Sequence, residues 1–162
     1  MLDIRIKTVD YSDIARWVSL SKEYDGYIKE IVSDLTEWYE GDGSSSVSFD
    51  DYMGSKISKG EAFMAIGADD DCRGIIAVSI ANNRITFFGV SHKYDFYEVG
   101  DFLLAYALSK LNINANITTN IVKSNAEPFQ KERSLFNKYD FTYSHDGLEN
   151  GVPVCCIERR NY

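Results

Sequence analysis

Short apolar stretches, several of them alternating with polar residues, recur along the chain and predict strands. In the first, Leu2, Ile4 and Ile6 alternate with charged neighbours, as in a half-buried strand. The other expected strands cover residues 62–68, 74–81, 84–90, 113–122, 141–144 and 152–158. Asp and Asn residues between the second, third and fourth of these strands suit tight turns, so the three are expected to form an antiparallel meander.

A second pattern, with apolar residues three and four positions apart, predicts about four helices. Asp10 or Ser12 can cap the first helix, because a short polar side chain accepts a hydrogen bond from a helix N-terminal amide. The expected helical segments cover residues 14–18, 24–39, 48–57, 99–111 and 125–138. The helix over 99–111 is apolar nearly all round, which places it against a sheet in the middle of the domain.

The order of strand, buried helix and strand over residues 84–122 predicts a right-handed parallel crossover. This crossover would lie at the centre of an otherwise antiparallel sheet. The polar, glycine-containing stretch 41–46 is expected to be a flexible loop. The sequence therefore predicts one α+β domain over residues 1–162, with a mixed, mostly antiparallel sheet of about seven strands and with about four helices.

Composition excludes some classes of partner. The chain has 162 residues, with 17 basic and 25 acidic side chains, and a net charge of −8. A nucleic-acid backbone is bound by clustered Lys and Arg, so this balance argues against a nucleic-acid partner. It favours a small ligand or a cationic partner.

The ends of the chain and the cysteines give no indication of secretion or of a membrane location. The first residues lack the apolar stretch of a signal peptide, and no apolar run reaches the roughly 18 residues that a membrane span needs. Cys72, Cys155 and Cys156 are odd in number and lack metal-ligand spacing. We expect a cytoplasmic protein without a membrane or metal site, in which one or more of these thiols fill apolar space.

Residues 84–104 carry a family resemblance. A strand ends at Val90, a bend follows, and Gly100 opens an apolar helix that contains the pair Leu103 and Leu104. This segment resembles the central motif of the GNAT acetyltransferase superfamily. Downstream, residues 122–125 (Val-Lys-Ser-Asn) and 135–141 (Leu-Phe-Asn-Lys-Tyr-Asp-Phe) resemble a second signature of that family, which is a strand, an Asn, and a helix ending in Leu-Tyr-x-x-x-Gly-Phe.

The resemblance implies a GNAT-like fold and an N-acetyltransferase that uses acetyl-CoA as cosubstrate. The pantetheine arm would add like a strand beside the end of strand 84–90, and the pyrophosphate would meet the amides at a helix N-terminus. The implied coenzyme-binding residues are Phe88, Gly89, Val90, Asp95, Phe96, Tyr97, Glu98, Val99, Gly100, Asp101 and Asn125. The acceptor would be an amine of a small molecule or of a peptide.

Two acidic residues depart from the family pattern. Asp95 stands where the family has Gln or Arg, and Glu98 stands where it has the first glycine of the loop. In one interpretation, both carboxylates face the pyrophosphate and weaken its binding. In the other, Asp95 is a helix N-cap and forms a capping-box-like pair with Glu98, so that the helix amides are already satisfied.

The candidate catalytic residues are His92, Ser124 and Tyr139. His92 follows the coenzyme strand and titrates in a useful range. Phe136 stands where many relatives have the tyrosine that protonates the departing thiolate, and a phenyl ring has no proton to give. Tyr139, three residues on, or the Ser124 hydroxyl could supply that proton, although packing is the alternative function of both aromatic rings.

Other interpretations remain open. Glu30, Asp34, Glu37 and Glu40 could attract a cationic amine or simply form a solvated helix face. The whole domain could be a binding or regulatory module on the same fold, or an acidic interaction domain for a basic protein. A monomer or a homodimer fits the sequence.

Overall fold

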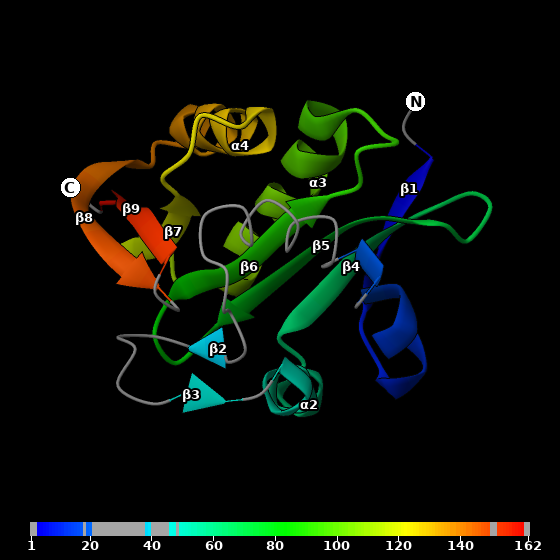
Figure 1. Ribbon diagram of the computed structural model, residues 1–162. Coiled ribbons are helices and arrows are strands. Elements are labelled where there is room, and N and C mark those ends of the chain that lie inside the picture. Colours follow the sequence, from blue (N-terminus) through cyan, green and yellow to red (C-terminus); the bar gives the residue numbers. More distant parts are fainter. Residues whose placement is uncertain are drawn as a thin grey trace.

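A computed structural model describes residues 3–17, 19–20, 38–39, 46–47, 49–149 and 152–160. Its centre is a seven-stranded sheet with the order β1-β4-β5-β6-β7-β9-β8 (Figure 1). The strands of this sheet are β1 (Ile4–Thr8), β4 (Ala62–Gly67), β5 (Cys72–Ser79), β6 (Arg84–Val90), β7 (Ile117–Val122), β8 (Thr142–Glu149) and β9 (Val152–Arg159). The helices with full bounds are η1 (Tyr11–Asp13), α2 (Phe49–Lys59), α3 (Phe96–Lys110) and α4 (Glu127–Lys138).

The sheet has the topology that the sequence predicts. β6 and β7 are parallel neighbours, whereas every other neighbouring pair in this sheet is antiparallel. The chain runs from β6 through α3 to β7, and this is the expected crossover. The α+β fold class and the seven-stranded, mostly antiparallel sheet are therefore confirmed.

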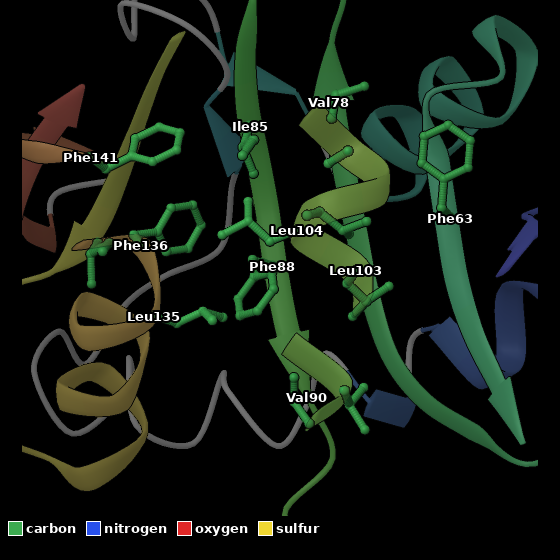
Figure 2. Packing of buried hydrophobic residues seen from close by; sticks show 14 of the residues in the cluster. Phe63, Val78, Ile85, Phe88, Val90, Leu103, Leu104, Leu135, Phe136 and Phe141 are labelled. Atoms are coloured by element: carbon green, nitrogen blue, oxygen red, sulfur yellow. The ribbon is translucent and has the colours of Figure 1, made fainter. Parts of the chain in front are cut away.

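Two hydrophobic layers cover the faces of the sheet. On one face, α3 packs over β4, β5 and β6 through Leu103 and Leu104, and α4 packs against α3 and β7, with Phe136 reaching Phe88 of β6 (Figure 2). On the other face, Trp17 and Leu20 of the N-terminal helical residues cover β4 and β5. No helix among the described residues is long and apolar enough to cross a bilayer.

The predicted helix over residues 24–39 is wrong at its end. Trp38–Tyr39 form the short strand β2, which pairs with β3 (Ser46–Val47). Two adjacent aromatic residues suit a pleated strand as well as a helix, and pairing with β3 decides between them here. Residues 21–37 and 40–45 lie outside the described residues. They hold the rest of that predicted helix, most of the expected loop, and the acidic residues Glu30, Asp34, Glu37 and Glu40.

Two strand boundaries also differ from the prediction. β7 begins at Ile117 rather than at residue 113, because Asn112 accepts a hydrogen bond from the Asn114 amide and turns the chain there (3.0 Å). β8 continues to Glu149, through residues 146–149 that were expected to be a loop, because these residues pair with β9. The closing hairpin is therefore longer and its connection shorter than expected.

Candidate functional site

β6 and β7 pair with each other at only one end. Arg84 opposite Thr118 is the single registered pair among the described residues, and both lie near the start of their strands. The Thr119 hydroxyl adds one bond, donated to the Ile85 carbonyl (2.9 Å). Beyond these residues no further registered pair between β6 and β7 occurs in the described part of the chain. We refer to residues 86–90 of β6 and 120–122 of β7 as the splayed half.

The side chain of Asn83 stabilises the end at which β6 and β7 pair. Its side-chain amide donates to the carbonyls of Asn112 and Asn116, each at 2.9 Å. Its side-chain oxygen accepts from the Asn112 amide at 2.8 Å. Asn83 also has a φ of 50°, a left-handed conformation that Asn tolerates better than most residues. The turn before β6 is thereby tied to the turn before β7.

Aromatic rings from β6 and α4 meet over the splayed half. Phe88 of β6 contacts Phe136 of α4 edge to face, with ring centroids 5.5 Å apart (Figure 2). Phe136 contacts Phe141 in the same way at 5.1 Å. The predicted residues Phe88, Gly89 and Val90 are all buried, and their strand pairs with β5 on its other side. This part of β6 is consequently held rigidly, although it does not pair with β7.

The N-terminus of α3 lies beyond the end of β6, at the splayed half. Asp95 is its N-cap, and the Asp95 carboxylate accepts from the Glu98 amide at 2.8 Å. This is the first half of the predicted capping box. The reciprocal bond from the Glu98 side chain does not occur, and Glu98 is exposed. No acceptor for the amides of Phe96 and Tyr97 occurs in the described part of the chain, so two helix amides remain for an acidic group.

The next residues of α3 face inward or toward α4. Val99 and Gly100 are buried. A Cβ atom on Gly100 would stand 2.7 Å from Leu135 Cδ2 and 3.3 Å from Phe88 Cζ, so the absence of a side chain lets α3 approach α4 and β6 closely. Asp101 forms an ion pair with Lys138 of α4, with 2.9 Å between Oδ2 and Nζ. Gly100 and Asp101 thus join the two helices.

One cation lies among the acids at the start of α3. Lys131 of α4 pairs with Glu127 one turn earlier, at 2.9 Å. The hydrogen bond that Lys131 donates to Glu127 is the main cause that raises the pKa of Lys131, and the charges of Glu127, Tyr97 and Asp95 raise it further. Lys131 is therefore close enough to the α3 N-terminus to offset part of its negative charge.

The loop that leads into α3 is fixed to the turn between β4 and β5, which lies beside the end of β6. The Tyr94 hydroxyl donates to Asp71 Oδ2 (2.5 Å), and Arg73 Nε donates to the same oxygen (2.8 Å). These two bonds hold the pKa of Asp71 at about 2. The Arg73 guanidinium also lies over the Tyr94 ring, 4.8 Å from its centroid. The turn between β4 and β5 thus positions the entry to α3.

The three candidate catalytic residues are not brought together by the contacts of the structure. His92 is exposed in the turn after β6. The Ser124 hydroxyl accepts from the Ala126 amide (3.1 Å) and shapes the turn into α4, beside the exposed Asn125. The Tyr139 hydroxyl donates to the Asp101 carbonyl (3.4 Å), and burial is the main cause that raises the pKa of Tyr139. Tyr139 therefore links α4 to α3.

Sequence analysis missed one residue near the splayed half. Glu132 of α4 is only 7% exposed, and burial raises its pKa to about 8, against the opposing charge of Arg133. It lies three residues after Phe129 and four before Phe136, within the apolar stripe of the helix. That spacing was the signal that could have identified it. No group of His, Cys, Asp and Glu side chains suited to a metal ion occurs among the described residues.

Comparison with known proteins gives structural likeness without close sequence relatives. No family model matches the chain, and no curated protein matches it. Solved structures do match over nearly the whole chain. Naa50 from Arabidopsis thaliana, in complex with a CoA-containing bisubstrate analogue, is 16% identical with a TM-score of 0.63, and the match covers 97% of this chain and 98% of that one.

Two bacterial proteins match similarly. The putative acetyltransferase yncA from Salmonella typhimurium, with acetyl-CoA, is 12% identical with a TM-score of 0.63, covering 99% of this chain and 95% of that one. The ribosomal-protein-S18-alanine N-acetyltransferase from Escherichia coli is 12% identical with a TM-score of 0.64, covering 98% and 94%. The chain has the fold of the GNAT acetyltransferases, as the sequence motifs predicted.

Proposed function

We propose that this protein is an N-acetyltransferase that transfers the acetyl group of acetyl-CoA to an amine of a small molecule or a peptide. The observation that carries the proposal is the splayed half of the β6–β7 pair, which opens beside the N-terminus of α3. An extended pantetheine arm can pair with a strand edge, and a pyrophosphate suits helix amides. Both features belong to one end of the sheet, on a fold whose solved examples include complexes with acetyl-CoA.

The residues at this end fit the coenzyme in part. The amides of Phe96 and Tyr97 and the cation of Lys131 suit phosphate oxygens. Asp95 and Glu98 oppose them, because Asp95 already takes the Glu98 amide and both side chains are acidic and exposed. We expect weak coenzyme binding that depends on salt concentration, since the opposing charges are solvent-exposed.

The transfer itself requires attack by a neutral amine on the thioester carbonyl. One proton must leave the nitrogen, and one must reach the departing sulfur. Phe136, Phe88 and the other buried rings exclude water from the inner part of the splayed half, which strengthens any hydrogen bond to the reacting carbonyl.

The alternative is a binding module on the same fold without coenzyme. The Asp95 N-cap favours it, because this carboxylate occupies part of the donor set that a pyrophosphate would use. The two functions differ in one simple measurement, the melting temperature of the protein with and without acetyl-CoA. At a concentration ten times the Kd, binding stabilises the native state by about 1.4 kcal/mol, which is roughly a 3–6 °C shift.

We expect that shift at millimolar acetyl-CoA in low salt, and a smaller one for Lys131→Glu. Lys123→Glu is the matched control, because Lys123 pairs with Asp146 of β8 rather than with a group of α3 or α4. Absence of any shift in the wild-type protein would overturn the acetyltransferase function and favour the binding module. Equal losses in both charge reversals would mean that Lys131 has no special position toward the coenzyme.

A further inference from the structure

Glu132 is a buried acidic residue of α4, and no hydrogen bond or ion pair to it occurs among the described residues. The residue is 7% exposed, and its carboxyl oxygens are not among the fully enclosed atoms without a partner, so the small exposed part includes the carboxyl group. An ionised carboxylate in such a place is costly, so the neutral acid is favoured. A neutral carboxyl group is a hydrogen-bond donor and holds a transferable proton.

The position of Glu132 follows from the helix. α4 begins just after the end of β7, at the splayed half, and Phe136 reaches Phe88 of β6. Glu132 lies four residues before Phe136, which is about 6 Å along the helix axis toward the splayed end. Its neighbours on the helix, Phe129 and Leu135, are buried in the same core. Glu132 therefore lies on the buried face of α4, the face from which Phe136 contacts Phe88 of the splayed half.

Burial outweighs the one charge that acts on Glu132, because the charge of Arg133 lowers its pKa and burial raises it further than that. On its own helix, Arg133 is the one charge that acts on it, and the Arg133 guanidinium donates to the Ser124 carbonyl (3.1 Å). On α3, Asp95 caps its helix and Asp101 pairs with Lys138. β7 carries no titratable side chain, and β6 carries none after Arg84.

We propose that Glu132 is the general acid that protonates the departing thiolate. Phe136 cannot do so, because its ring has no hydroxyl group. This proposal rests on the proposed acetyltransferase function. As the amine nitrogen bonds to the carbonyl carbon and the carbon–sulfur bond breaks, the carboxyl proton moves to sulfur. The nitrogen loses one proton to form the amide, and that proton restores the carboxyl group. Amine and acetyl-CoA thus give amide and free CoA, with no other reactant.

The test combines an activity assay with a direct titration. Wild type and the variants Glu132→Gln and Asp140→Asn are compared, with hydroxylamine as the acceptor probe and release of the CoA thiol as the signal, from pH 6 to 9. Gln keeps the shape of Glu132 but cannot release a proton. Asp140 is an exposed acid in the turn that ends α4, and Asn suits its φ of 71°, so this variant is the matched control.

The expected result is a fall in kcat of about 100-fold for Glu132→Gln, with a KM for acetyl-CoA within about twofold of wild type. Wild-type activity should fall above about pH 8, as Glu132 loses its proton. A carbon-13 spectrum should show one carboxyl carbon that titrates near this pH and is missing in Glu132→Gln. Asp140→Asn should match wild type in each measurement.

Three other results would overturn the proposal. If the wild-type enzyme is active and Glu132→Gln has the same kcat, Glu132 is not the proton donor. The proposed acetyltransferase function then still stands. If Glu132 titrates in the ordinary range of glutamate, it is ionised at neutral pH and has no proton to donate. A wild-type protein that neither binds acetyl-CoA nor releases thiol removes both the proposed function and this one.

Discussion

The two ends of the β6–β7 pair are built from different chemistry. At the paired end, Asn83 and Thr119 make directional hydrogen bonds between the turns and the two strands. At the splayed end, Phe88, Phe136 and Glu132 are buried where β6 and β7 have no registered pair with each other in the described part of the chain. Directional polar bonds hold the end where the strands pair, and nonpolar packing against α4 covers the end where they do not pair with each other. Substitutions at each end should therefore have different signatures.

The largest effect is expected for Phe136→Ala, which removes a fully buried ring between Phe88 and Phe141. Such truncations cost about 3–5 kcal/mol, because the surrounding core collapses only in part. Urea denaturation measures the loss. Tyr143→Ala is the control, since this ring is 61% exposed and its removal should cost under about 0.5 kcal/mol. Similar midpoints for the two variants would show that the splayed end does not depend on its aromatic cover.

Glu132→Gln should change how stability depends on pH. The pKa of Glu132 is raised from 4.5 to about 8 in the folded protein, so the folded state holds a proton that the unfolded state loses above pH 4.5. Wild-type stability should therefore fall as the pH rises from about 4.5 to about 8, and the variant lacks this loss. The difference in unfolding free energy should grow by roughly 3–5 kcal/mol over that window.

Thermal or urea unfolding at pH 5, 6.5 and 8 measures this difference between Glu132→Gln and wild type. Parallel curves for the two proteins would contradict the buried, unpartnered state of Glu132. Asp140→Asn serves again as the control, because an exposed acid should leave the pH dependence unchanged.

At the paired end, Asn83→Ala should cost about 1–3 kcal/mol, because it removes three hydrogen bonds and places Ala at a positive φ. Asn83→Gly removes the same bonds, but glycine adopts the left-handed conformation without strain. Its loss of unfolding free energy should therefore be smaller than that of Asn83→Ala, by the cost of placing Ala at a positive φ. Urea denaturation of both variants separates the two causes. If Asn83→Ala is as stable as wild type, the polar network does not hold the paired end.

The smallest effect is expected at the α3 N-terminus. Glu98→Gly and Glu98→Gln each remove an exposed negative charge beside the proposed phosphate position, and should tighten acetyl-CoA binding about two- to fivefold in low salt. Calorimetric titration at two salt concentrations measures the affinity, and added salt should reduce the gain. Unchanged or weaker binding by both variants would show that Glu98 does not face the phosphates.

Much of this architecture was predictable because it depends on local patterns. The apolar helix α3 and the strands on either side of it fixed the crossover, and their motif indicated the GNAT fold that structural comparison supports. Asp95 followed from cap chemistry. The crossover and the Asp95 cap depend on residues close together in the sequence, so periodicity and spacing are sufficient for them, whereas the GNAT fold was indicated by the resemblance of the motifs.

The remaining features depend on contacts between distant parts of the chain. Trp38–Tyr39 became a strand through pairing with β3, and Asn83 matters because its turn lies beside residues 112 and 116. Glu132 lies in the apolar stripe of a helix that also carries exposed acids such as Glu127. The spacing is a local signal for its buried side, but how deeply it is buried depends on packing against the core.

The single registered pair between β6 and β7 also bears on how the protein avoids self-association. A strand edge with free pairing capacity is a template for another chain, and proteins usually blunt such edges where they meet the solvent. Here the divergence lies in the middle of the sheet, between β6 and β7, and α3 and α4 cover one face of it. The fold can therefore offer an edge to an extended small ligand while folded helices obstruct the approach of a second sheet.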